Sequence, residues 1–352
     1  MPPRVRPLER ASAAAWDAFV TAHPDGSFFH RAAWAGVIAA AFRHRTDYLF
    51  AEQDGAISGV LPLVHMRTLL FGNTLVSTPF CVTGGPLARD AASRAVLLDR
   101  ARDLMRGLGA SALELRTPRA PDANEDWPAY PEGWQVRDDL YCGFRRKIAP
   151  DHEANMQAIP RKQRAMVRKG IANGLSATQG RSLDPFFRVY AESVRNLGTP
   201  MFPRRYFRLL LDAFPDCSDI TTVHDGGIPI AAVLNFYFRD EVLPYYGGGT
   251  RLARNRAAND FMYWQVMRQA ADRGCRVFDF GRSKIGTGAY DFKRNWGFVP
   301  QPLAYRYLLA PGAKVPDHNP LNPKYRLFIA AWRHLPLGVA NLIGPHIVRG
   351  VG

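Results

Sequence analysis

The chain has 352 residues, of which 47% are hydrophobic and 12% aromatic, and such a composition excludes a mainly disordered protein. Its length is enough for two domains that each bury their own core. The formal net charge of +15 favours an anionic partner, such as a nucleotide-linked substrate, tRNA, CoA or an anionic membrane.

The four cysteines lie far apart in the sequence, with no C-x-x-C pair and no histidine cluster beside them. This spacing predicts neither a zinc site nor a disulfide framework, and it favours a reducing compartment. The N-terminal segment lacks the sustained apolar run of a secretory signal, and no stretch of about 18 consecutive apolar residues suits a transmembrane helix. We therefore expect a cytoplasmic protein, with a peripheral contact at the inner face of the membrane as a second option.

The first half of the chain alternates helical and strand patterns. In chain order it predicts short helices over 1–47, a hairpin from Tyr48 that turns at Asp54-Gly55, a strand over Leu75–Cys81, a helix that Ser93 caps and Gly109 ends, and a strand over Ala112–Leu115. A segment rich in Pro, Asp and Asn, Thr117–Gly133, then predicts an exposed loop.

The second half repeats this order of elements. It predicts a hairpin over Ile220–Phe238 that turns at Asp225, a strand that ends at Tyr246 and Gly247–Gly249, a helix that Asn259 caps and Gly274 ends, and a strand over Val277–Phe280. The two turn aspartates lie 171 residues apart (225 − 54), and the two closing glycines lie 165 apart (274 − 109). Nearly constant offsets favour duplication of one α/β unit, although chance similarity of two ordinary units stays open.

These patterns predict domains over 1–150 and 151–310, followed by a tail over 311–352. The tail begins with a connector that holds Pro311, Pro316, Pro320 and Pro323. It continues as an amphipathic helix whose apolar residues alternate with Lys and Arg, which is compatible with a peripheral membrane contact.

The most informative stretch is Arg276–Phe298. Its strand runs into a glycine-containing loop, after which Phe292 and Trp296 flank the basic residue Lys293. A lysine at the edge of a glycine loop can bind phosphate or stabilise an oxyanion. It can equally belong to an amphipathic turn and extend its amine to solvent, and the residues alone leave both interpretations open.

The motifs D-F-G-R-S and Y-x-F-K-x-x-W-G in this stretch resemble the signature of FemAB-like transferases, which belong to the GCN5-related N-acetyltransferase (GNAT) superfamily. Most similar is the branch associated with exosortase and exopolysaccharide loci. The resemblance implies an α/β (α+β) fold of two tandem GNAT-like domains, each with a mixed, mostly antiparallel sheet flanked by helices. It also implies that Lys293 stabilises the tetrahedral intermediate of acyl transfer, and that the C-terminal segment packs on the first domain.

Further candidate residues surround this motif. Asp279 is a candidate general base, although an aspartate between two phenylalanines can equally hold the loop by hydrogen bonds. A helix that begins at Pro160 carries Arg161, Arg164 and Arg168 on one face, which suits phosphate binding or simply a solvated surface. The residues that we expect to bind substrate are Arg164, Arg168, Tyr246, Arg282, Ser283, Tyr290, Phe292 and Trp296.

These features predict an acyl- or aminoacyltransferase without a metal or a tightly bound cofactor. Residues 282–288 approach the acetyl-CoA loop (Q/R)-x-x-G-x-(G/A), but the first glycine comes one residue late and no clear helix pattern follows. The donor therefore stays open between acyl-CoA and aminoacyl-tRNA. The resemblance implies an acceptor among cell-envelope or exopolysaccharide precursors, such as an anionic small molecule or a lipid-linked glycan. The alternative is a non-catalytic protein that binds an anionic glycan or the membrane surface, and general nucleic-acid binding is a weaker third option.

Overall fold

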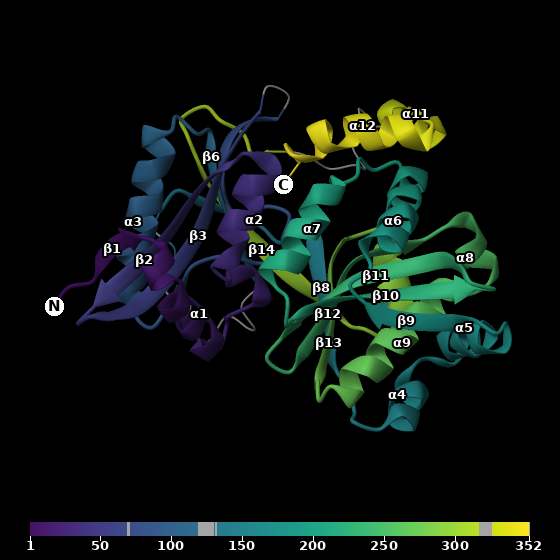
Figure 1. The fold of residues 1–352 in the computed structure, drawn as a ribbon. Helices are drawn as coiled ribbons and strands as arrows, with labels where there is room; N and C mark the ends of the chain where they lie inside the picture. The colour runs from purple at the N-terminus through teal and green to yellow at the C-terminus, as the bar shows by residue number, and fades with distance from the viewer. Residues whose placement is uncertain (69–70, 119–129, 131, 317–325, 352) are drawn as a thin grey trace. The chain divides into compact units, whose positions relative to one another are not determined.

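The structure is a computed structural model, and it describes residues 1–68, 71–118, 130, 132–316 and 326–351. It divides into two compact units (Figure 1). The first unit contains Met1–Tyr141 and two short later segments, and the second contains Cys142–Gln301 and the C-terminal helices. The first boundary therefore lies about one strand before the predicted position near residue 150.

The first unit is built on a sheet whose strands lie in the order β1-β2-β3-β4-β6-β14. Strand β5 pairs with β3, and β7 pairs with β14. The strands are β1 (Arg4–Pro7), β2 (Arg45–Gln53), β3 (Ala56–Thr68), β4 (Gly72–Ser77), β5 (Leu87–Ala88), β6 (Ala112–Pro118), β7 (Trp134–Arg137) and β14 (Pro300–Leu309). The helices are η1 (Arg10–Ser12), α1 (Ala13–Ala22), η2 (Phe28–His30), α2 (Ala33–Phe42) and α3 (Ala91–Gly107).

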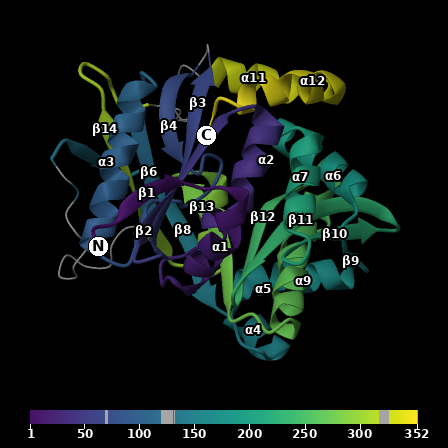
Figure 2. The same ribbon diagram turned by 60° about the vertical axis from the view of Figure 1, so that its left-hand side comes forward.

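The second unit is built on a sheet whose strands lie in the order β8-β13-β12-β11-β10-β9 (Figure 2). The strands are β8 (Tyr141–Lys147), β9 (Ser176–Gly180), β10 (Ser218–Asp225), β11 (Ile228–Phe238), β12 (Glu241–Gly249) and β13 (Val277–Lys284). The helices are α4 (His152–Ala158), α5 (Arg161–Ala172), α6 (Leu183–Leu197), α7 (Arg204–Ala213), α8 (Arg251–Asn255), α9 (Ala258–Asp272), α10 (Gly288–Asn295), α11 (Arg326–His334) and α12 (Leu337–Val348).

The two units share one sequence of pairings. In the first, β2, β3 and β4 pair antiparallel, and α3 then leads to β6, which pairs parallel with β4. In the second, β10, β11 and β12 pair antiparallel, and α9 then leads to β13, which pairs parallel with β12. Gly109 and Gly274 follow α3 and α9 with φ angles of 59° and 89°, a left-handed conformation that favours glycine. The predicted fold class of mixed, mostly antiparallel sheets flanked by helices is thus confirmed.

Two predicted helix starts differ from the structure. Helix α3 begins at Ala91 and is capped three residues before Ser93, because Asp90 accepts a hydrogen bond from the Ser93 N–H at 2.7 Å. Helix α9 is not capped by Asn259 but follows Ala257, whose φ is 57°. The Asn259 side chain faces β12 instead, since a Cβ on Gly249 would lie 2.5 Å from Asn259 Oδ1.

The C-terminal segment forms two helices, α11 and α12, which contact α6 of the second unit. This placement of the helices differs from the expectation that the segment packs on the first domain, whereas residues 311–316 and 349–351 of the same segment belong to the first unit. Two glycines let these helices approach the second unit closely, because a Cβ on Gly198 would lie 2.5 Å from Ile329, and one on Gly344 would lie 3.1 Å from the backbone of Met201. Most of the predicted 117–133 loop, together with Pro320 and Pro323, lies outside the described residues.

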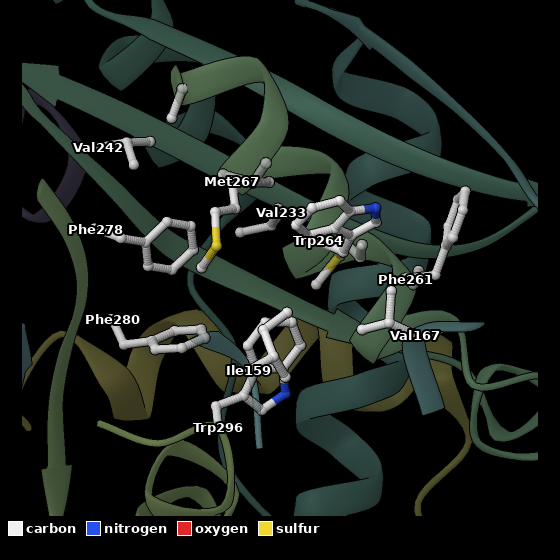
Figure 3. Close-up of a cluster of buried hydrophobic side chains, with 14 of the residues drawn as sticks. Ile159, Val167, Val233, Val242, Phe261, Trp264, Met267, Phe278, Phe280 and Trp296 are labelled. Carbon is white, nitrogen blue, oxygen red and sulfur yellow. The ribbon is translucent and has the colours of Figure 1, made fainter. Parts of the chain in front are cut away.

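In the core of the second unit, α5 and α9 pack against one face of the sheet, to which β13 contributes Phe278 and Phe280. Figure 3 shows Trp264 and Met267 of α9, Phe278 and Phe280 of β13, and Trp296 pointing into one cluster. Because Phe278 and Phe280 point into the core, Asp279 lies on the opposite face of the strand. In the described part of the chain, we find no helix whose length and hydropathy suit a membrane span.

Candidate active site

A left-handed glycine, Gly281, interrupts the regular backbone of β13, and we call this irregularity the bulge. The φ angle of Gly281 is 66°, and its N–H donates a hydrogen bond of 2.7 Å to Oδ1 of Asp279. In a regular strand, successive carbonyl groups point to opposite sides. The left-handed conformation at Gly281 breaks this alternation, so that three consecutive carbonyl oxygens point toward one group.

That group is the ammonium group of Lys293, in the last turn of α10. Its Nζ donates to the carbonyl oxygens of Phe280 at 2.7 Å, Gly281 at 3.3 Å and Arg282 at 3.0 Å. Three backbone acceptors thus match the three N–H donors of an ammonium group. Lys293 therefore does not extend its amine into solvent, and it fixes α10 to the end of β13.

Aromatic rings and burial lower the polarity around this amine. Lys293 Nζ lies 5.4 Å from the ring centroid of Phe144 and 6.0 Å from that of Phe280. Burial lowers the pKa of Lys293 to about 7, a shift that Asp279 opposes and Arg282 assists. Burial also raises the pKa of Asp279 above its usual value, while the hydrogen bond from Gly281 opposes that shift. The site therefore holds a lysine that titrates near neutral pH beside a buried carboxyl group.

Helix α10 begins at Gly288, where the sequence had shown no clear helix pattern. The Thr287 hydroxyl accepts a hydrogen bond from the Tyr290 N–H, and this N-cap explains the helix start. The Tyr290 ring packs edge-on against Phe144, with 5.4 Å between the ring centroids. Phe292 is half-buried against the core, at 5.6 Å from the ring of Tyr263. Both side chains therefore support the position of Lys293.

Trp296 belongs to a buried polar network. Its side chain is 0% exposed, and its Nε1–H donates to Oδ1 of Asp260 at 2.9 Å. Gln163 of α5 donates to the same oxygen at 2.7 Å. Burial raises the pKa of Asp260, and the two donated hydrogen bonds oppose that shift. Trp296 was predicted to bind substrate, but it has no exposed surface with which to do so, and its observed contacts connect α10 to α5 and α9.

The arginines of α5 have different surroundings. Arg164 donates to the carbonyl oxygens of Gln157 and Ile159, both at 3.2 Å, and to Gln157 Oε1. It therefore closes the C-terminal end of α4. Arg168 is exposed, which leaves its guanidinium accessible to a solute. Of the residues that follow Gly281, Arg282 is half-buried and Ser283 is buried.

Tyr246 lies at the end of β12 in an aromatic cluster. Its hydroxyl shares a hydrogen bond of 2.9 Å with that of Tyr206 on α7, and both rings are buried. The adjacent glycines have a packing reason, because a Cβ on Gly248 would lie 2.1 Å from Ser193 Oγ.

The structure therefore brings only some of the predicted site residues together in one place. Asp279, Arg282, Tyr290, Phe292 and Lys293 lie around the end of β13 and α10. Two features were missed by the sequence analysis: the ring of Phe144, and the carboxylate of Asp260. The latter had a detectable signal, because Asp260 lies one helical turn before Trp264 on the apolar side of α9.

Metal ligation has no candidate in the described part of the chain, where no three His, Cys, Asp or Glu side chains are grouped closely enough to hold an ion. The observed groups suit charge stabilisation and proton transfer instead.

Residues 155–294 match the acetyltransferase (GNAT) domain family. The second unit carries a GNAT acetyltransferase domain. The matched residues run from α4 to Arg294 and include the whole of β13 and Lys293, so the chain is an acyltransferase by class. No curated protein is significantly similar to the chain in sequence.

Several solved structures share the fold of this chain. FemX is 15% identical with a TM-score of 0.68, and the match covers 93% of this chain and 100% of FemX. L-PGS from Bacillus licheniformis is 13% identical with a TM-score of 0.54, covering 94% and 96%. A tandem GNAT protein from the clavulanic acid biosynthesis pathway is 14% identical with a TM-score of 0.53, covering 87% and 97%. The similarity to FemX and to a tandem GNAT protein agrees with the fold that the sequence motifs predict.

Proposed function

We propose that the chain transfers an acyl or aminoacyl group from acyl-CoA or aminoacyl-tRNA to an amine or hydroxyl of a cell-envelope or exopolysaccharide precursor. The acetyltransferase domain supports the acyl transfer, and GNAT domains in general take acyl-CoA as co-substrate. The motifs of residues 279–297 support a FemAB-like enzyme of the exosortase-associated branch. The fold shared with FemX and with the C-terminal domain of a protein from Agrobacterium fabrum described as a putative lysylphosphatidylglycerol synthetase is compatible with an anionic small molecule or a lipid-linked precursor as acceptor.

The observation that carries this proposal is the enclosed ammonium group of Lys293. In the reaction, the acceptor nitrogen or oxygen forms a bond to the acyl carbon, the carbonyl oxygen becomes an oxyanion, and the bond to the thiol or ribose oxygen then breaks. A fixed positive charge in a site of low polarity stabilises that oxyanion strongly. In the structure all three N–H groups of Nζ donate to backbone carbonyl oxygens. During the reaction, Lys293 must therefore replace one of these hydrogen bonds by one to the oxyanion. The longest of these hydrogen bonds, to Gly281 at 3.3 Å, is the one that we assign to this exchange.

Asp279 has two roles in the proposal. Its Oδ1 accepts the Gly281 N–H and so positions the bulge. We assign Oδ2 to accept the proton that the attacking amine or hydroxyl loses, because burial raises the pKa of this carboxyl group. We assign Arg168 and Arg282 to bind donor or acceptor phosphates. Arg164 has a structural role instead, because it holds the C-terminal end of α4.

The test is mass spectrometry of the purified protein with acyl-CoA or charged tRNA and candidate acceptors. The proposal expects an acylated acceptor and a rate that depends on Lys293. Binding of an anionic glycan without transfer, unaffected by Lys293→Ala, would support the non-catalytic alternative instead.

A further inference from the structure

Helices α11 and α12 each bury one face and leave the other uncovered. Trp332 of α11 is 2% exposed, and Ile329 packs against Gly198 at the end of α6. On α12, Ala340, Gly344 and Val348 are buried at a spacing of four residues. These buried faces hold the helices on the second unit, so their opposite faces have a fixed orientation.

The opposite faces carry two matching exposed stripes. On α11 the stripe contains Leu327, Ala330, Ala331 and His334, and on α12 it contains Val339, Leu342, Ile343 and His346. Both follow the spacing i, i+3, i+4, i+7 that aligns side chains along one side of a helix. Leu327 is 85% exposed and Leu342 is 72% exposed, so each stripe presents a large apolar side chain to solvent.

The charge of this region has one sign. The sequence has no Asp or Glu from residue 318 to residue 352, but it has Lys324, Arg326, Arg333 and Arg349. Exposed apolar stripes in a segment whose only Lys, Arg, Asp or Glu residues are basic match the properties of helices that lie in the interface of an anionic bilayer. A second copy of this chain is a poorer occupant, because a two-fold contact would place the same basic surface against itself.

We propose that the exposed face of α11 and α12 is a docking surface for a bilayer that contains anionic lipid. The apolar side chains enter the boundary between headgroups and acyl chains, and the exposed Arg333 of α11 meets the lipid phosphates. The helices lie on the bilayer rather than cross it, since α12, the longer of the two, has only 12 residues. The surface lies outside the groups assigned to acyl transfer, so its failure would leave the proposed reaction untouched.

The test is co-sedimentation of the full chain with vesicles of phosphatidylcholine alone or mixed with phosphatidylglycerol, at low and high salt. We expect binding to the mixed vesicles that salt weakens. Leu327→Ser combined with Leu342→Ser should weaken this binding by roughly tenfold or more. The matched control is Ile228→Ser combined with Val299→Ser, two side chains 62% and 72% exposed elsewhere on the second unit, and it should bind like the wild type.

Three outcomes would overturn the proposal. The first is that the wild type binds neither kind of vesicle. The second is that the variant with both Leu327→Ser and Leu342→Ser binds the mixed vesicles as well as the wild type does. The third is that the wild type forms a dimer and does not bind vesicles, and that this variant is monomeric. Turnover of a soluble acceptor is measured in parallel, and the variant should retain it, so that loss of docking is distinguished from loss of catalysis. Circular dichroism of each variant verifies that it is folded.

Discussion

Lys293 donates a hydrogen bond of 2.7 Å to the backbone carbonyl of Phe280, so that the last turn of α10 is fixed to the strand that enters the core. The same strand bends at Gly281, which brings two further carbonyl groups to the amine. Lys293 thus has two roles, a structural one through this hydrogen bond and a proposed catalytic one through its charge. The predictions below separate these two contributions.

The pH dependence of stability tests the burial of the Lys293 amine. Because the folded protein lowers this pKa to about 7, the unfolded chain binds more protons between pH 7 and the ordinary lysine range near 10.5. The free energy of unfolding of the wild type should therefore rise with pH across this window, relative to Lys293→Met. Urea unfolding at several pH values measures it, and parallel curves for both proteins would contradict a depressed pKa.

The pH dependence of activity tests the charge state that the reaction requires. If the protonated amine stabilises the oxyanion, kcat should decline as pH rises through about 7, where Lys293 loses its proton. Lys293→Arg stays charged over this range and should remove that decline, although its geometry lowers the rate. A decline that persists unchanged in Lys293→Arg would assign the titration to another group.

Gly281→Ala tests the bulge that assembles the three carbonyl groups. A residue with a Cβ is strained at a φ of 66°, and we expect a loss of about 1 kcal/mol in stability together with reduced kcat. Gly288→Ala is the matched control, because this glycine begins α10 and has open space around its Cβ position. Thermal unfolding and turnover of both variants are compared, and equal effects would show that the bulge has no special role.

Asp260→Leu tests the network that holds Trp296. It leaves the Trp296 Nε1–H and the Gln163 amide buried without their shared acceptor, which should cost about 1–3 kcal/mol for each donor. Asp260→Asn keeps an acceptor oxygen and should cost less. Burial raises the pKa of Asp260 above its ordinary value of 3.8, so the free energy of unfolding should fall as pH rises above 3.8 and this carboxyl group loses its proton. Asp260→Asn should abolish that dependence. Denaturant unfolding from pH 3 to pH 7 measures both effects.

Arg168→Ala tests the assignment of α5 to phosphate binding. Its guanidinium is exposed, so its removal should raise KM for the anionic donor and reduce the salt dependence of KM while the protein stays equally stable. Arg164→Ala is the contrasting variant, and it should lower stability because it removes the contacts to Gln157 and Ile159. Unchanged KM in Arg168→Ala would remove this residue from the binding site.

The repeated fold was predictable because its signals are local. The left-handed glycines at 109 and 274 end their helices by backbone conformation, and alternating apolar residues mark the hairpins, so matching offsets predict matching units. Helix starts were less predictable. Asp90 and Ser93 are both suitable caps three residues apart, and Asn259 faces β12 because Gly249 leaves it room. Such choices depend on neighbours that are distant in sequence.

The candidate site was predictable in its residue types but not in its contacts. The sequence marks Lys293 by its aromatic flanks, yet its three partners are backbone carbonyls that converge only because Gly281 is left-handed. Trp296 carries the same aromatic signal as Phe292 but lies wholly in the core, since Asp260 accepts its N–H. Spacing alone does not distinguish an aromatic residue that borders a site from one that supports it.

The most direct test of the central claim is the single-turnover rate of acyl transfer by Lys293→Ala, followed by mass spectrometry of the acceptor. Circular dichroism at the assay temperature must first show that the variant is folded. The account predicts a rate lower than that of the wild type by about 10² to 10³, with donor binding retained. A folded Lys293→Ala protein that transfers the acyl group at the wild-type rate would contradict it.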